Sequence, residues 1–183
     1  MRKLILTLLI GALIAGALFV GQAQAVTYVG GTPEQRSTVQ SVLESCWLDY
    51  RWVEDTLGYV EISFKADQPA QGQAWRGAIV LRASLTGDEL RHVAAHEWAH
   101  EVYWAVTYDH RWEWTLMVTG GTWDGTTWRT NPAENFAECM RHALWPRQAA
   151  PDTELLVIEP AACRAFLVND VLSQGGQPWR TEF

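Results

Sequence analysis

Three residues, His96, Glu97 and His100, form the pattern H-E-x-x-H within the run TGDELRHVAAHEWAHEVY that begins at Thr86. Residues four apart lie on the same face of a helix, so both imidazoles can bind one ion at about 2.0–2.1 Å. The pattern predicts a zinc site with His96 and His100 as ligands and Glu97 as the general base. His92 lies one turn earlier and is expected to be a supporting or surface residue.

The segment that carries these residues is predicted to be a helix beginning after Thr86. Thr86 and Glu89 have the spacing of a capping box, and Asp88 and Glu89 place negative charge in the first turn. No Gly or Pro interrupts the run from Leu90 to Trp104, whose apolar side chains recur at helical spacing. We therefore expect this helix to be buried along much of its length.

A catalytic zinc site needs a third ligand from the protein. In the pattern of the metzincins, H-E-x-x-H-x-x-G-x-x-H, the glycine and the third histidine would fall on Tyr103 and Val106. The sequence therefore excludes that pattern. The remaining common solution is a glutamate from a helix further along the chain.

The segment NPAENFAECMRHAL is predicted to be that second helix, because Asn131 can cap it and Pro132 suits its first turn. Glu134, Glu138 and His142 follow one another at four-residue spacing on one face. One carboxylate would bind the metal, and another would accept a hydrogen bond from a ligating imidazole. These residues by themselves leave open which glutamate is the ligand.

The combination of H-E-x-x-H with a later N-x-x-E-x-F-A-E segment resembles the gluzincin metallopeptidases. Residues 129–138 look like the third-ligand helix of anthrax-lethal-factor-like proteases. The resemblance implies that Glu134 is the zinc ligand and that Glu138 supports the site. Those proteases carry an oxyanion-stabilising tyrosine seven residues before the ligand, where this chain has Thr127. The candidates that remain for the oxyanion donor are Tyr103, Tyr108, His110, Arg129 and His142.

Residues 1–25 have the three parts of a secretory signal peptide: two basic residues, a long apolar run and an A-x-A sequence that ends at Ala25. Cleavage after Ala25 would leave residues 26–183 as one zincin-like metallopeptidase domain that is secreted or extracytoplasmic. The alternative for this apolar run is an uncleaved membrane anchor.

The chain is acidic, with 14 Lys and Arg against 21 Asp and Glu and a net charge of −7. Loss of a signal peptide with two basic residues would make the charge more negative. An acidic surface repels phosphate backbones, which argues against a nucleic-acid partner. We expect a monomer that acts on a protein or peptide substrate, such as the peptide of a cell wall. Once the signal peptide is removed, no membrane contact is expected.

The three cysteines of the chain are Cys46, Cys139 and Cys163. An exported protein meets oxidising conditions, so one internal disulfide with one thiol left over is expected. The sequence does not choose among the possible pairs.

The rest of the chain predicts a small, mainly helical α+β domain with a short sheet before the zinc helix. Further helices are expected at 32–50, 131–145 and 160–172. Residues 60–64 and 77–85 predict strands. The remaining stretches are expected to be irregular, with a loop at 66–72 and turns around one or two short strands or a brief helix at 107–130.

Tryptophan is unusually frequent, with 11 residues among 183. The ordinary use of so many indoles is packing in the core. The alternative is an exposed aromatic platform built from Trp112, Trp114, Trp123 and Trp128. Such a platform would make the chain a non-catalytic zinc-containing module that binds a cell wall or polymer. The glutamate Glu97 favours catalysis, because a structural zinc site has no use for a general base.

Overall fold

The computed structural model describes residues 26–46, 48–121, 127, 130–145 and 159–171. These residues form the α+β fold that the sequence predicts, with helices and one short sheet. The expected signal peptide, residues 1–25, lies outside the described residues.

The sheet has four strands in the order β1-β2-β4-β3. They are β1 (Val26–Val29), β2 (Val60–Lys65), β3 (Gly72–Trp75) and β4 (Ala78–Arg82). Strands β1, β2 and β4 are parallel, whereas β3 pairs antiparallel with β4 and forms an edge of the sheet. The sequence predicted β2 and β4 but missed β1 and β3, because four-residue strands are too short to show a clear alternation of apolar and polar residues.

Two helices connect β1 to β2: α2 (Pro33–Ser45) and α3 (Tyr50–Leu57). Thr32 and Gln35 form a capping box at the start of α2. The prediction of one helix over 32–50 is wrong at its end, because the backbone becomes extended at Cys46. Asp49 then caps a new helix by accepting a hydrogen bond from the backbone N–H of Arg51 at 3.1 Å.

The helix predicted from the H-E-x-x-H run is confirmed as α4 (Gly87–Ala105). Its capping box is wrong, because the Thr86 side chain makes no capping hydrogen bond. Glu89 instead accepts a hydrogen bond from the Gln71 side chain at 2.7 Å. This contact ties the start of α4 to the segment just before β3.

A twelve-residue helix, α5 (Tyr108–Thr119), occupies much of the stretch for which the sequence predicted turns around short strands or a brief helix. It begins at the cap Thr107 and ends at Gly120, which adopts the left-handed conformation with φ of 70°. Trp114 anchors this helix: it is fully buried, and its ring packs edge-on against Phe136 with 5.5 Å between centroids. Tertiary packing therefore stabilises a helix whose own periodicity is weak.

The second predicted site helix is confirmed as α6 (Pro132–Leu144), and Asn131 caps it by accepting from the backbone N–H of Ala133 at 2.9 Å. It is followed by α7 (Pro160–Ala165) and a π-helical segment, η2 (Phe166–Val171). A disulfide between Cys139 and Cys163 joins α6 to α7. Cys46, the remaining cysteine, is buried and does not take part in this disulfide. The disulfide indicates an oxidising environment.

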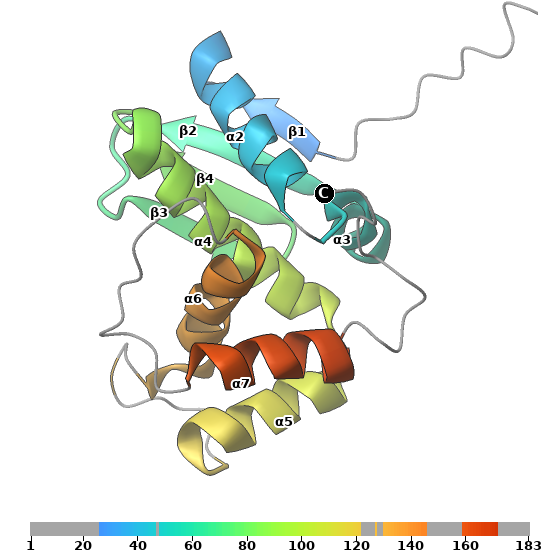
Figure 1. The fold of residues 1–183 in the computed structure, drawn as a ribbon. Helices are drawn as coiled ribbons and strands as arrows, with labels where there is room; N and C mark the ends of the chain where they lie inside the picture. Colours follow the sequence, from blue (N-terminus) through green and yellow to red (C-terminus); the bar gives the residue numbers. More distant parts are fainter. Residues whose placement is uncertain (1–25, 47, 122–126, 128–129, 146–158, 172–183) are drawn as a thin grey trace, which may run out of the picture.

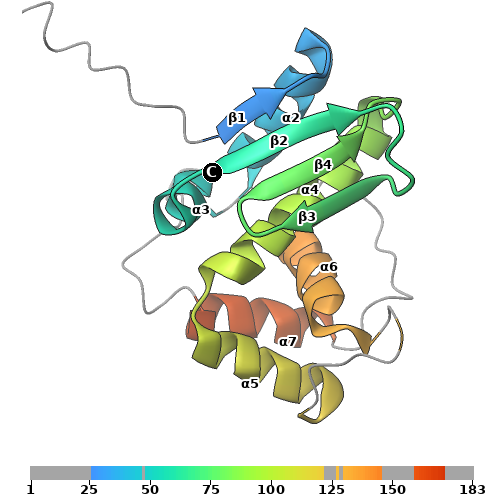
Figure 2. The ribbon, with the colours of Figure 1, turned by 180° about the vertical axis from the view of Figure 1, so that it is seen from behind.

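The described elements are arranged around α4 (Figure 1). Helices α2 and α4 cover one face of the sheet, and the view from behind shows the sheet in front of them (Figure 2). Helices α5, α6 and α7 gather beside the C-terminal half of α4 (Figures 1 and 2). As a result, α4 has one side against the sheet and another against α6. Among the helices that the structure describes, none has the length and apolar character needed to cross a bilayer.

Candidate metal centre

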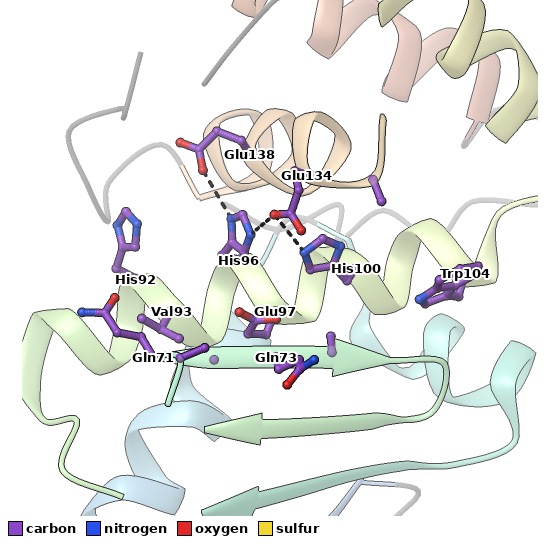
Figure 3. A pocket seen from close by; sticks show the side chains of 14 residues that line it. Gln71, Gln73, His92, Val93, His96, Glu97, His100, Trp104, Glu134 and Glu138 are labelled. Carbon is purple, nitrogen blue, oxygen red and sulfur yellow. Dashed lines mark hydrogen bonds and ion pairs between the residues drawn. The ribbon is translucent and has the colours of Figure 1, made fainter. Parts of the chain in front are cut away.

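Helices α4 and α6 bring together the three residues that the sequence predicts as metal ligands. His96 Nε2 lies 3.1 Å from Glu134 Oε2, and His100 Nε2 lies 3.6 Å from the same oxygen. Figure 3 shows both imidazoles pointing from α4 toward the Glu134 carboxylate. One ligand atom from each residue lies within 4.8 Å of the others, so this group can hold a metal ion.

Two of the separations in this group are close to those between ligands that share one ion. Four ligands at about 2.0–2.1 Å from a tetrahedral centre stand about 3.3 Å apart, close to the two separations that involve Glu134 Oε2. The two imidazoles come from successive turns of one helix and the carboxylate from another. The site therefore depends on the packing of α4 against α6.

Glu138 lies one turn further along α6, behind the first histidine. Its Oε2 is 3.4 Å from His96 Nδ1, and it accepts hydrogen bonds from Arg141, one of them from Nε at 3.0 Å. Burial alone would raise the pKa of Glu138, but hydrogen bonds from His96 and Arg141 outweigh it and hold the pKa at about 2. An ionised Glu138 can therefore orient the imidazole of His96.

Glu134 and His96 shift each other's protonation in opposite directions. Burial would raise the pKa of Glu134, but hydrogen bonds from His100 and His96 lower it far below its ordinary value. Burial opposes protonation of His96, yet hydrogen bonding to Glu134 and Glu138 raises its pKa to about 9. A proton and a metal ion would therefore compete for this imidazole.

Glu97 lies beside this group on α4 but faces the sheet side. Figure 3 shows it between the two histidines and strand β3. The side chain is 7% exposed, and burial raises its pKa against the opposing effect of His96 and His100. Glu97 can therefore take up a proton at a higher pH than an ordinary glutamate.

An open cleft of about 620 Å³ contains the site. Strand β3 and the residues just before it line one side, and α4 and α6 line the other. The lining residues are Ala70, Gln71, Gly72, Gln73, Ala74, His92, Val93, His96, Glu97, His100, Trp104, Ala133, Glu134 and Glu138. His92, which the sequence placed at a supporting or surface position, therefore faces the same cleft as the metal group.

A second hollow of about 350 Å³ adjoins the cleft and shares Trp104 and Ala133 with it. Its wall includes Tyr103 and Tyr108, and Trp104 is 37% exposed. The Arg111 guanidinium lies 5.8 Å and 5.7 Å from the ring centroids of Tyr103 and Trp104. Three of its lining residues are aromatic, Tyr103, Trp104 and Tyr108, and we call it the aromatic hollow; it lies beside the C-terminal end of α4.

The described candidates for the oxyanion donor do not line the metal cleft. Tyr103 packs against Phe136, and His110 pairs with Thr107. Neither belongs to the lining of the metal cleft. His142 also lies outside that lining, where its Nε2 is 3.5 Å from Glu138 Oε1.

Two further described positions, Tyr108 and Thr127, also lie outside the lining of the metal cleft. Tyr108 lines the aromatic hollow but not the metal cleft. Thr127 is exposed and its hydroxyl pairs with that of Thr130 at 3.2 Å. Arg129 lies outside the described residues.

The prediction that Trp114 belongs to an exposed aromatic platform is wrong. Trp114 is fully buried, and its Nε1 donates a hydrogen bond to the carbonyl of Pro132 at 2.7 Å. Trp123 and Trp128 lie outside the described residues. Trp114 thus belongs to the core that supports α6.

Sequence reasoning missed the part of the cleft that β3 contributes, including Gly72 and Gln73. The sequence signal for β3 was the glycine at position 77, directly before β4, since glycine is favoured in tight hairpin turns. In the structure Gly77 has φ of 81°. A comparison of the chain with protein-family models, with curated proteins and with solved structures finds no match.

Proposed function

We propose that this protein is a secreted, zinc-dependent metallopeptidase of the gluzincin type that hydrolyses peptide or amide bonds. The observation that carries the proposal is the convergence of His96, His100 and Glu134 in an open cleft, with the buried carboxylate of Glu97 beside them. A metal group built only for stability would need neither the cleft nor the fourth residue.

The donor set favours zinc over the harder divalent ions. Two imidazoles with one carboxylate are a typical ligand set of catalytic zinc, whereas calcium and magnesium prefer sites made of oxygen alone. When bound, zinc supplies a water molecule of lowered pKa and polarises a carbonyl group. His96, His100 and Glu134 would hold it, and Glu138 would orient His96 through Nδ1.

Glu97 would move the proton during hydrolysis. Its carboxylate accepts the proton of the attacking water and then delivers it to the nitrogen of the leaving amine. Burial raises the pKa of Glu97 above that of an ordinary glutamate, and a stronger base accepts a proton from water more readily.

Strand β3 supports a peptide as the substrate. It is an edge strand beside the cleft, and within the described sheet no strand pairs with its outer edge. An extended peptide can add to such an edge through backbone hydrogen bonds. The aromatic hollow beside Trp104 would accept an apolar side chain of that peptide.

The export of the protein is supported by two independent features. The disulfide between Cys139 and Cys163 indicates an oxidising environment. Residues 1–25 have the composition of a signal peptide. An exported peptidase would meet secreted proteins or the peptide of a cell wall.

The test compares wild type with Glu97→Gln, and with Glu113→Gln as a matched control at an exposed position of α5. We expect zinc-dependent cleavage of a mixed peptide library by wild type and by Glu113→Gln, and its abolition by a chelator. Glu97→Gln should retain zinc near one equivalent and lose hydrolysis by a factor of about 10²–10⁴. Full activity in Glu97→Gln would contradict the proposal, and tight polymer binding without turnover would favour a binding module.

A further inference from the structure

Strand β3 begins at a glycine that lies directly against α4. A Cβ added to Gly72 would lie 2.5 Å from Oε1 of Glu97 and 2.6 Å from its Cγ. It would also lie 2.7 Å from Cγ1 of Val93. All three separations are shorter than the van der Waals contact distances of carbon and oxygen. Any side chain at this position would therefore displace Glu97, Val93 or the strand itself.

The need for glycine here concerns space and not backbone conformation. Among the described residues, Gly77 and Gly87 are examples of glycines with positive φ, whereas Gly72 does not have positive φ. An L-residue could therefore adopt the backbone angles of Gly72 without strain. Glycine in a strand weakens it, and a close approach of another group is a common reason for its presence. At Gly72 that group is the Glu97 side chain.

We propose that Gly72 is a positioning residue for Glu97: the bare backbone of β3 closes the sheet side of this carboxylate and holds it toward the metal group. This inference rests on the proposed function, because it assigns the position of the general base. The sheet side of Glu97 is filled by β3, and His96 and His100 lie on its other side (Figure 3). The carboxylate therefore cannot move toward the sheet without meeting β3.

The same contact fixes the distance between β3 and α4. Val93 precedes Glu97 by one helical turn, and both side chains meet Gly72. The hydrogen bond from Gln71 to Glu89 holds the neighbouring residue to the same helix. Gly72 therefore determines how close the edge strand comes to Glu97. It also determines how close a peptide bound along that strand would come to Glu97.

Replacement of Gly72 by alanine should affect hydrolysis much more than metal binding. The ligands come from α4 and α6, and none comes from β3. We expect Gly72→Ala to bind one equivalent of zinc and to lower kcat about 100-fold, since a misplacement of about 1 Å in a catalytic group has effects of that size. KM should change by less than kcat.

The matched control is Gly87→Ala, the same substitution at the first residue of α4. A Cβ at Gly87 meets nothing within 4 Å, but its φ of 55° is unfavourable for alanine. This control therefore loses stability through backbone strain without any contact with Glu97. Its kcat should remain near that of wild type. Wild-type kcat in zinc-loaded Gly72→Ala would overturn the inference.

A second measurement tests the contact without relying on hydrolysis. The melting temperature of the full chain is compared for wild type, Gly72→Ala, Glu97→Ala and the double variant. Gly72→Ala should lower it by about 5 °C when Glu97 is present and by clearly less when Glu97 is alanine. If wild type cleaves no peptide, the proposed function fails while this cycle still decides whether Gly72 confines Glu97. Equal losses in both backgrounds would overturn the inference.

Discussion

Two pairs of glutamates lie on two sides of helix α4, and their pKa values shift in opposite directions. Toward α6, Glu134 and Glu138 have lowered pKa values. Toward the sheet, Glu97 and Glu101 have raised pKa values. All four are glutamates, and Glu138 is as deeply buried as Glu101, so residue type and burial do not explain the difference.

The partners of each carboxylate explain it. On the α6 side, His96, His100 and Arg141 supply positive charge and hydrogen bonds, which outweigh the effect of burial. On the sheet side, Glu101 is fully buried and accepts a hydrogen bond from the backbone N–H of Gly77 at 2.8 Å. Burial dominates there and raises the pKa of Glu101 to about 7.

The comparison shows how one helix can separate two chemical tasks. Carboxylates that remain ionised suit the binding of a cation and the orientation of its ligands. A carboxylate with a raised pKa is a stronger base than an ordinary glutamate, which suits proton transfer. Glu97 lies between the two sides, next to His96 in sequence and against β3 in space.

The largest expected effect concerns metal binding on the α6 side. Glu134→Ala should abolish stoichiometric zinc binding, because it removes one of three ligands. Glu138→Ala should weaken binding by about 10–100-fold, as the loss of a supporting residue does. Titration calorimetry with zinc would measure both. Stronger loss from Glu138→Ala than from Glu134→Ala would reverse the assignment of the ligand.

The next effect concerns the stability of the metal-free protein. Glu138→Gln leaves the buried guanidinium of Arg141 without its charged partner, which should cost about 3 kcal/mol at neutral pH. The pKa of Glu138 is lowered, so its contribution is present above its ordinary value of 4.5 and is lost as the pH falls toward 2.

Urea unfolding at several pH values measures this dependence. The difference between wild type and Glu138→Gln should be largest above about pH 5 and should shrink in acid. A constant difference at every pH would show that the carboxylate charge is not what stabilises the α6 side.

The next prediction concerns the disulfide, which should affect both the stability of the protein and its zinc affinity. Cys139 and Cys163 are separated by 24 residues, and closing a loop of that length contributes about 3 kcal/mol. The double variant Cys139→Ala/Cys163→Ala should lose that much stability and bind zinc more weakly, because α6 carries Glu134. Cys46→Ala is the control, since Cys46 is buried outside this bond. Unchanged zinc affinity in the double variant would separate the disulfide from the site.

The smallest expected effect concerns the sheet side and has the opposite pH dependence. The pKa of Glu101 is raised from 4.5 to about 7, so its contribution is fully present below 4.5 and is lost as the pH rises through 7. Glu101→Gln keeps an oxygen that can accept from Gly77 and carries no charge. It should stabilise the protein by about 2 kcal/mol at pH 8 and by little at pH 4.5.

Thermal unfolding at those two pH values tests this expectation, with Glu61→Gln as a control at an exposed position of β2. Destabilisation by Glu101→Gln at both pH values would mean that the ionised carboxylate is favourable where it lies. The two sides of α4 would then not differ in the way that their partners indicate.

The sequence determined the parts of this protein that depend on one helix at a time. The spacing of His96 and His100 requires only helical geometry, and the cap at Asn131 and the four-residue spacing of Glu134 and Glu138 are equally local. The strands β2 and β4 were also readable, because alternation and apolar runs are local signals.

Only the tertiary structure decided how these parts meet. It brought Glu134 to the histidines and Glu138 behind His96, and it packed Gly72 against Glu97. It also formed α5 around the buried ring of Trp114, where the local pattern indicated turns. The physical reason is that helix periodicity is set by neighbouring residues, whereas the approach of β3 and α6 to α4 is set by packing between distant segments. The H-E-x-x-H pattern thus placed Glu97 between two histidines, and packing placed it against β3.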